Sequence, residues 1–345
     1  MHHTGERRVI GILVVNLGTP DAPTAPAVRR YLREFLSDTR VVELPRVLWW
    51  PILNGPILRF RPARSARNYA SIWLPDGSPL MVYSQRQCDA LQARWDRQFP
   101  GQVRVELAMR YGNPSVAKGM AALRDAGCGR ILVVPLYPQY AAATTASTFD
   151  AVAKELRKWR EIPEMRMIRD WHAHPAYIGA LADSIRAWWQ AHGQAERLLI
   201  TFHGLPESSV LKGDPYRAQC EKTTALLVQA LGLSDDQWVQ SFQSRFGAAR
   251  WLGPYTDRTL VGLASAGVSR VDAVCPGFAA DCVETLQEIA IEGKETFLHA
   301  GGQELRYIPA LNDNPLWIEA FSRILEPHWR DWDAPENFAV SPESG

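Results

Sequence analysis

Two segments in the second half of the chain carry side chains that could move protons and handle a cation. The first, TFHGLP from Thr201, places His203 directly after a short apolar run. The second, CPGFAADCVETLQEI, follows another apolar run and carries three acids, Asp281, Glu284 and Glu288. Ligands bind at the carboxyl ends of strands in open α/β sheets, so a base and acids arriving from two such ends indicate a site.

The acids have a simpler explanation as well. At about 100° per residue, Asp281, Glu284 and Glu288 fall within a stripe about 60° wide on one helix face. Apolar residues such as Val283 and Leu286 occupy the opposite side. The acids could therefore be the solvated face of an ordinary helix, and a single His at a strand end could be a core residue.

The elements that would position these side chains alternate along the chain, which indicates βαβ units and parallel sheets. The expected strands are Val9–Val15, Val103–Met109, Arg130–Leu136, Met165–Ile168, Leu198–Phe202, Trp238–Phe242 and Val271–Val274. The expected helices are Ala27–Leu36, Ser84–Gln98, Ser115–Ala126, Ser147–Arg160, Pro175–Ala191, Pro215–Leu231, Tyr255–Ala266, Cys282–Glu292 and Pro315–Trp329.

A weak internal repeat indicates two similar halves. VVNLGTP resembles LITFHGLP, and ILVVPLYPQY resembles VDAVCPGFAAD. We therefore expect an α/β fold with two Rossmann-like, doubly wound parallel-sheet domains that face each other across a cleft. The expected division is an N-terminal domain at 8–163, a C-terminal domain at 164–311, a C-terminal helix across both at 312–331, and a loose tail at 332–345.

The first half carries an apolar insertion, which we call the flap and place at about residues 41–80. It contains the pair Trp49–Trp50 and a basic end with Arg59, Arg61 and Arg64. Such a segment suits a large flat apolar ligand that carries carboxylates, or the surface of a bilayer. The alternative is a helical excursion that packs back on its own domain, although the prolines of the flap make a regular amphipathic helix awkward.

Composition narrows the class of protein. The length of 345 residues favours two domains, and 46% hydrophobic with 22% charged residues is ordinary for a soluble protein. A net charge of +1 provides no broad basic surface for nucleic acid. The five cysteines form neither a disulfide framework nor paired metal-ligand spacing, which favours a cytoplasmic setting. No apolar run approaches the ~20 residues of a spanning helix.

A series of segments resembles the bacterial ferrochelatases, in the order of that family and from about Val9 to Trp329. They are NLGTP at Asn16, DGSPL at Asp76, MRYGNPS at Met109, PLYPQYAAATTAS at Pro135, FHGLPESSVLKGDPY at Phe202, FQSRFGAARWLGPYTD at Phe242, CPGFAADCVETLQEI at Cys275 and LNDNPLW at Leu311. The family inserts ferrous iron into a porphyrin, and its fold has two Rossmann-like domains around a porphyrin cleft.

The resemblance implies roles for particular residues. His203 and Glu284 would accept pyrrole protons and bind the metal, and Asp281 and Glu288 would relay protons or iron. The porphyrin-binding positions would be Asn16, Leu17, Tyr69, Ser78, Arg110, Tyr111, Trp251 and Phe278. Without the resemblance, the aromatic residues of this set would be ordinary core residues and Arg110 a structural ion-pair partner.

The resemblance also implies ferrous iron as a substrate, with no permanently bound cofactor. Some members hold an iron–sulfur cluster through cysteines near the C-terminus, but this chain has no Cys after Cys282, so we expect no cluster. Some relatives have His at the position of Cys282. We expect protoporphyrin IX as the porphyrin, with coproporphyrin III as the alternative. We also expect a monomer in the cytoplasm, with peripheral membrane contact through Trp49–Trp50.

Two other functions compete. A chelatase that inserts cobalt or nickel into a sirohydrochlorin-like ring would need more basic residues and histidines for the many carboxylates of that ring. A periplasmic-type binding protein would need export, whereas the short β-branched run after Arg8 is typical of a strand. No GxGxxG fingerprint follows that run, which argues against a nucleotide-dependent enzyme.

Overall fold

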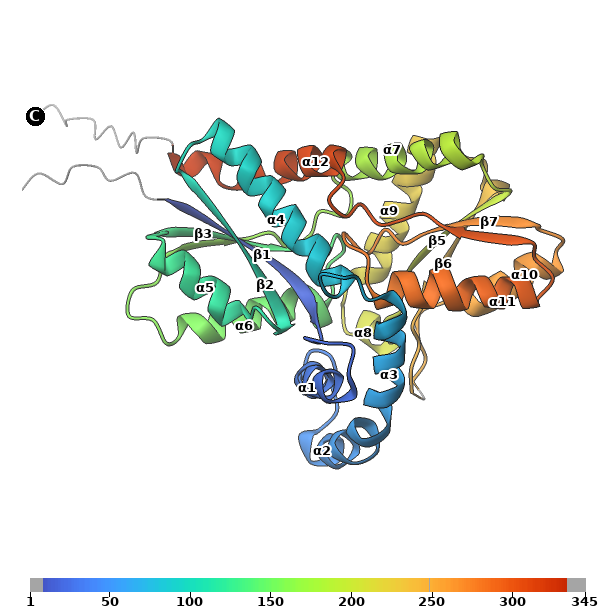
Figure 1. Ribbon diagram of the computed structural model, residues 1–345, viewed down its shortest axis with the longest axis horizontal. Coiled ribbons are helices and arrows are strands. Elements are labelled where there is room, and N and C mark those ends of the chain that lie inside the picture. The colour runs from blue at the N-terminus through green and yellow to red at the C-terminus, as the bar shows by residue number, and fades with distance from the viewer. Residues whose placement is uncertain (1–8, 248, 334–345) are drawn as a thin grey trace, which may run out of the picture.

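Two parallel four-stranded sheets form the centre of the computed structural model, which describes residues 9–247 and 249–333 (Figure 1). The first sheet has the order β2-β1-β3-β4, with β1 (Ile10–Thr19), β2 (Val103–Gly112), β3 (Arg130–Pro135) and β4 (Glu164–Met167). The second has the order β6-β5-β7-β8, with β5 (Arg197–His203), β6 (Trp238–Gln243), β7 (Arg270–Val274) and β8 (Glu304–Tyr307). The predicted fold of two parallel-sheet halves is confirmed.

The central strands are largely apolar because helices cover both faces of each sheet. In β1, for example, nine of ten residues are buried. The strand β8 was not predicted. Its sequence ELRY is short, lies at a sheet edge and alternates in burial, so it lacks the continuous apolar run that identified the other strands.

Helices surround both sheets. In the first half these are α1 (Ala25–Leu36), α4 (Pro79–Gln98), α5 (Val116–Asp125) and α6 (Ser147–Leu156), with a π-helix, η2 (Ala142–Ala146), before α6. In the second half they are α7 (Pro175–His192), α8 (Glu207–Leu211), α9 (Tyr216–Leu231), η3 (Asp235–Gln237), α10 (Thr256–Ser265), η4 (Val283–Gly293) and α11 (Lys294–His299).

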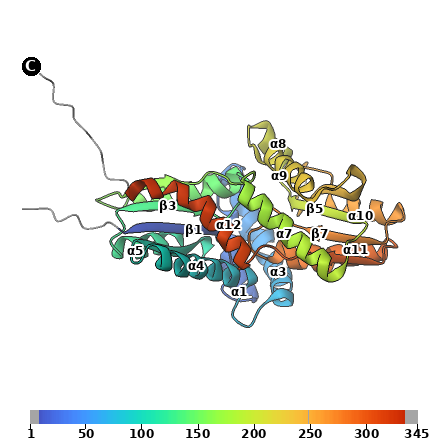
Figure 2. The ribbon, with the colours of Figure 1, turned by 90° about the horizontal axis from the view of Figure 1, so that it is seen from above.

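The C-terminal helix α12 (Pro315–Leu325) contacts α4 of the first half and α7 of the second. Seen from above, α12 lies over the first sheet and α7 over the second (Figure 2). The indole N–H groups of buried aromatic residues fix this packing, since Trp95 donates to Ser322 Oγ at 3.0 Å. One hydrophobic cluster therefore runs from β1 through α12 and α7 to β5.

Two short 3-10 helices follow α12, namely η5 (Glu326–His328) and η6 (Arg330–Asp333). Trp332 is buried, and its indole donates to Glu164 Oε1 at 2.5 Å. Ordered packing therefore extends into the segment that we expected to be a loose tail from residue 332. The rest of that tail, residues 334–345, lies outside the described residues.

The flap is helical throughout its apolar part, with α2 (Arg46–Ile52), the π-helix η1 (Leu53–Ile57) and α3 (Leu58–Ile72). Figure 1 shows α1, α2 and α3 together below the junction of the two sheets. The expectation that the prolines would disfavour a helix is wrong. Pro51, Pro56 and Pro62 lie inside these helices, and the π-helix between α2 and α3 changes the hydrogen-bond register where the chain bends.

The two tryptophans of the flap differ in burial. Trp49 is buried, and its indole N–H donates to the carbonyl oxygen of Leu36 at 2.7 Å, which ties α2 to the end of α1. Trp50 is 51% exposed. The helical excursion considered from the sequence is therefore correct for the buried side of the flap, and the other side leaves apolar groups in solvent. Within the described residues, no helix is long and apolar enough to cross a bilayer.

Candidate active site

A cleft of about 840 Å³ lies between the two halves and receives residues from the carboxyl ends of five strands. The lining includes residues after β1 and β3 in the first half and after β5, β6 and β7 in the second. This volume falls within the range of pockets that hold small ligands and cofactors. The position also agrees with the rule that α/β sheets bind ligands at the carboxyl ends of their strands.

His203 is the last residue of β5 and lines the cleft. Its Nδ1 lies 2.7 Å from the carbonyl oxygen of Gly204. A carbonyl oxygen can only accept, so this contact assigns the proton of a neutral imidazole to Nδ1. The other ring nitrogen, Nε2, then carries a lone pair, and the side chain is a base at the edge of the cleft.

Glu284 and Glu288 also line the cleft, and both belong to the π-helix η4. Asp281 does not line it. That carboxylate is buried before the helix begins and accepts hydrogen bonds from Tyr307 Oη at 2.6 Å and Asn312 Nδ2 at 2.7 Å. Thr285 Oγ1 donates to it as well, at 2.9 Å.

The expected stripe of three acids on one α-helix is therefore wrong in two respects. The helix begins after Asp281, and its hydrogen bonds follow the wider i→i+5 pattern. Asp281 holds the start of η4 through its bonds to Tyr307, Asn312 and Thr285, whereas Glu284 and Glu288 remain together at the cleft.

The two cleft acids strongly affect the electrostatics of the site. Burial, with a smaller contribution from the charge of Glu284, raises the pKa of Glu288 to about 8. The hydroxyl of Ser244 donates to Glu288 Oε2 and opposes this shift. Burial, followed by the negative charge of Glu284, also raises the pKa of the Tyr69 hydroxyl, and this phenol therefore stays protonated beside the acid.

Most of the predicted porphyrin-binding residues line the cleft. They are Asn16, Leu17, Tyr69, Ser78, Trp251 and Phe278. Asn16 is held in place because its Nδ2 donates to Ser84 Oγ at 2.9 Å and its Oδ1 accepts from the backbone of Leu17 at 2.8 Å. Ser78 accepts from Met81 N and so caps the start of α4.

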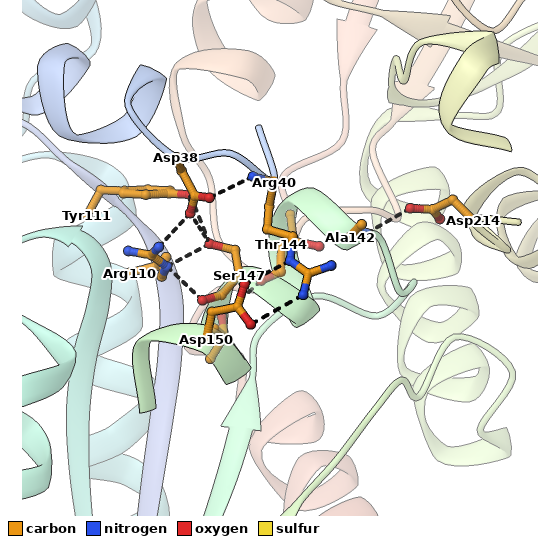
Figure 3. A network of polar contacts seen from close by, with 10 residues as sticks. Asp38, Arg40, Arg110, Tyr111, Ala142, Thr144, Ser147, Asp150 and Asp214 are labelled. Carbon is orange, nitrogen blue, oxygen red and sulfur yellow. Dashed lines mark hydrogen bonds and ion pairs between the residues drawn. The ribbon is translucent and has the colours of Figure 1, made fainter. Parts of the chain in front are cut away.

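Arg110 and Tyr111 are not part of the cleft lining. Both contact Asp38 in the network of Figure 3, through Arg110 Nη2 at 2.5 Å and Tyr111 Oη at 2.7 Å. Ser147 Oγ donates to the same carboxylate at 2.6 Å. Burial raises the pKa of Asp38, but the hydrogen bonds and the charge of Arg110 outweigh it, so the pKa lies below its ordinary value.

The network around Asp38 holds in place residues 40–44, which line the cleft and which we call the rim. The backbone N–H of Arg40 donates to Asp38 Oδ1 at 2.7 Å, and its guanidinium pairs with Asp150 at 2.8 Å. The residues from Arg40 to Leu44 line the cleft. Arg110 therefore lies where a structural ion-pair partner would, one layer behind this rim.

Several cleft residues were not predicted, among them Tyr31 of α1 and Tyr137 after β3. Tyr31 stacks with Phe35 at a centroid separation of 6.0 Å, and this i,i+4 aromatic pair was the signal that could have identified it. Of the three arginines at the basic end of the flap, Arg61 is the one that lines the cleft, and its guanidinium lies 5.1 Å from the centroid of the Phe246 ring.

Two contacts cross the cleft between the halves. The side chain of Lys212, after α8, forms an ion pair with Glu43 of the first half. Asp214 Oδ2 accepts from the backbone N–H of Ala142 at 2.7 Å (Figure 3). The second contact is the better shielded of the two, because Asp214 is half-buried whereas Lys212 is largely exposed.

Comparison with known proteins agrees with this geometry. A family model described as Ferrochelatase matches residues 9–328. A ferrochelatase from Thioalkalivibrio sulfidiphilus is 52% identical over 95% of this chain and 89% of its own length. One from Azoarcus sp. is 55% identical over 96% of this chain and 91% of its own length.

Solved structures share the fold at low identity. SirB from Bacillus subtilis with Fe3+ aligns over 92% of this chain and 95% of that chain, with a TM-score of 0.55 and 13% identity. The sirohydrochlorin chelatase SirB from Bacillus subtilis subspecies spizizenii with cobalt gives a TM-score of 0.54 at 12% identity, over 94% and 96% of the two chains. The fold is thus chelatase-like, and by its sequence the chain belongs to the ferrochelatase family.

Proposed function

We propose that this chain inserts ferrous iron into a porphyrin held in the cleft, with His203 and Glu284 as the reacting pair. The observation that carries the proposal is that both side chains line one cleft, with His203 Nε2 free to accept a proton. A free-base porphyrin must lose two pyrrole protons as four nitrogens take up the dication. A base within reach of those N–H groups is worth about 10²–10⁴-fold in rate.

Glu284 supplies the negative charge that an arriving dication requires, since unlike charges attract strongly where water is excluded. Glu288 is suited to carry the released protons onward. Its pKa of about 8 lies close to neutral pH, where an acid exchanges protons in both directions. No group of three or more His, Cys, Asp or Glu side chains in the described part of the chain is placed to hold a metal ion. Iron is a substrate in this scheme, and the porphyrin provides its lasting ligands.

The number of unpaired cations at the cleft favours a porphyrin with few carboxylates. Among the arginines and lysines of the described lining, Arg40, Lys212 and Arg245 each pair with a carboxylate. Arg61 pairs with none of the described carboxylates. One available guanidinium suits the two propionates of protoporphyrin IX better than the four of coproporphyrin III, and it would form charge-assisted bonds with one of them.

The flap presents an apolar surface beside the cleft. Its exposed side chains, which we call the flap face, are Leu44, Val47, Leu48, Trp50, Ile52 and Phe60. An amphipathic segment of this kind, bordered by exposed Arg59 and Arg64, suits the interfacial region of a bilayer. We propose peripheral membrane contact through the flap face, from which an apolar porphyrin could enter the cleft directly.

The central test is an oxygen-free assay with ferrous iron and protoporphyrin, followed by the loss of free-base fluorescence. His203→Ala is expected to lower kcat by at least about 10²-fold, because the base is removed, and Glu284→Gln to lower it similarly. Porphyrin binding should stay within about tenfold of the wild type. His299→Ala and Glu292→Gln are matched controls, since both side chains are exposed. Substantial turnover by His203→Ala would remove this residue from the proposed pair.

The role of Arg61 is tested with both porphyrins. Arg61→Gln is expected to raise KM for protoporphyrin about 10–100-fold, the equivalent of one lost charge-assisted contact, with a smaller change in kcat. Arg59→Gln is the matched control, because Arg59 is on the same helix but not in the cleft lining. Faster turnover of coproporphyrin than of protoporphyrin by the wild type would contradict the proposed substrate.

The raised pKa of Glu288 predicts how the free energy of unfolding depends on pH. Between about pH 4.5 and about pH 8 the folded protein retains a proton on Glu288 that the unfolded chain has released. The free energy of unfolding therefore falls through this window as pH rises, and Glu288→Gln removes that contribution. In urea unfolding, the variant should gain stability relative to the wild type from about pH 5 to about pH 8. Equal pH slopes for the two proteins would contradict the assigned burial of this acid.

Membrane contact is tested by co-sedimentation with anionic phospholipid vesicles. Replacing Val47 and Trp50 together by Ser should reduce binding by at least about tenfold, because both side chains are exposed and large. Val261→Ser is the control, an exposed apolar residue of α10 away from the flap. Trp49 is unsuitable, since its loss would break the contact with Leu36. Unchanged vesicle binding by the double variant would contradict the proposed membrane contact through the flap face.

A further inference from the structure

Gln243 lies directly beside His203 on the neighbouring strand. It is the last residue of β6, and the register of β5 with β6 pairs the two residues. The backbone N–H of Gly204, which follows His203, donates to the carbonyl oxygen of Gln243 at 2.7 Å. A Cβ at Gly204 would lie 2.6 Å from that oxygen, so the two backbones are in direct contact.

The side chain of Gln243 is 5% exposed and is not part of the cleft lining. Its Nε2 donates to the backbone carbonyl oxygen of Glu284 at 2.7 Å. Its Oε1 accepts from Thr201 Oγ1 at 3.2 Å. One buried amide thus joins the strand that ends in His203 to the first turn of η4.

These contacts form a series of hydrogen bonds, and the backbone carbonyl of Glu284 at one end of the series fixes the direction of each bond. The carbonyl of Glu284 can only accept, so the Gln243 amide group must face it and Oε1 must face Thr201. Thr201 therefore donates, and it accepts in turn from Thr256 Oγ1 at 2.8 Å. Ser241 Oγ, 2.8 Å from Thr256 Oγ1, donates to complete the series.

All four side chains of this series are buried, so removal of one partner leaves polar groups without hydrogen bonds in a place that water does not reach. Such a connected series favours a single arrangement of the elements that it joins. Here those elements are β5, β6, the start of α10 and η4.

We propose that Gln243 is a positioning residue, which sets the location of Glu284 relative to His203 through its amide. The inference rests on the proposed function of that pair. It assigns to Gln243 no contact with porphyrin or iron. Because misplacement of a reacting group by about 1 Å can lower a rate by about 10²-fold, loss of the amide should act on turnover.

The test is Gln243→Met, which keeps the length of the side chain and removes both polar atoms. We expect kcat for iron insertion to fall about 10–100-fold and KM for iron to rise, while the dissociation constant of protoporphyrin, measured by fluorescence, changes less than about twofold. Gln240→Met is the matched control, because Gln240 is on the same strand and has no described side-chain hydrogen bond. Thr201→Val is the second variant. It removes the hydroxyl donor to Oε1 and leaves the weaker contact of that oxygen with Cys275 Sγ at 3.8 Å, so the expected loss is about 3–10-fold in kcat.

The outcomes separate this inference from the function on which it rests. If the wild type inserts iron and His203→Ala does not, but Gln243→Met keeps kcat within about twofold, the positioning role is overturned. An equal loss of turnover and porphyrin affinity in Gln243→Met also overturns it, since that result indicates a general disturbance of the cleft. A wild type that inserts no iron refutes the proposed function itself. If Gln243→Met does not fold, a Thr201→Val kcat equal to that of the wild type overturns the inference.

Discussion

The parallel pairing of β5 with both β6 and β7 determines where the polar side chains of the second half meet the cleft. In-register pairing brings the carboxyl ends of these strands to one edge of the second sheet, so His203, Gln243 and the segment after Val274 begin together there. The residues of η4 then reach the same cleft as His203 although they are distant in sequence. A shift of the register would turn these side chains to the other face of the sheet.

Three acids lie in the cleft or directly beside it, and the structure accommodates Asp281 and Glu288 differently. Asp281 is satisfied by hydrogen bonds from three side chains. Burial, with a smaller contribution from the charge of Glu284, raises the pKa of Glu288 to about 8, so Glu288 keeps its proton near neutral pH.

The sequence could predict the fold and the presence of His203 and Glu284 at one cleft, because apolar runs and strand-end residues are local features. The π-helical form of η4 could not be predicted, since an i→i+5 pattern has no distinctive composition. The sequence also could not predict which arginines lie at the cleft and which form ion pairs behind it. Arg110 and Arg61 are the same residue type, but Arg110 contacts Asp38 at a separation of 72 positions, and no local pattern reveals that pairing. The apolar insertion of the flap was visible in its composition, but composition could not tell which of its side chains are buried and which are exposed.

The contacts of Glu43 with Lys212 and of Ala142 with Asp214 both join the first half to the short segment between α8 and α9. The two halves can therefore separate at this segment only if an ion pair and a hydrogen bond to a half-buried carboxylate are both broken. The ion pair is the more exposed of the two, so high salt should weaken it first and leave the Asp214 contact in place.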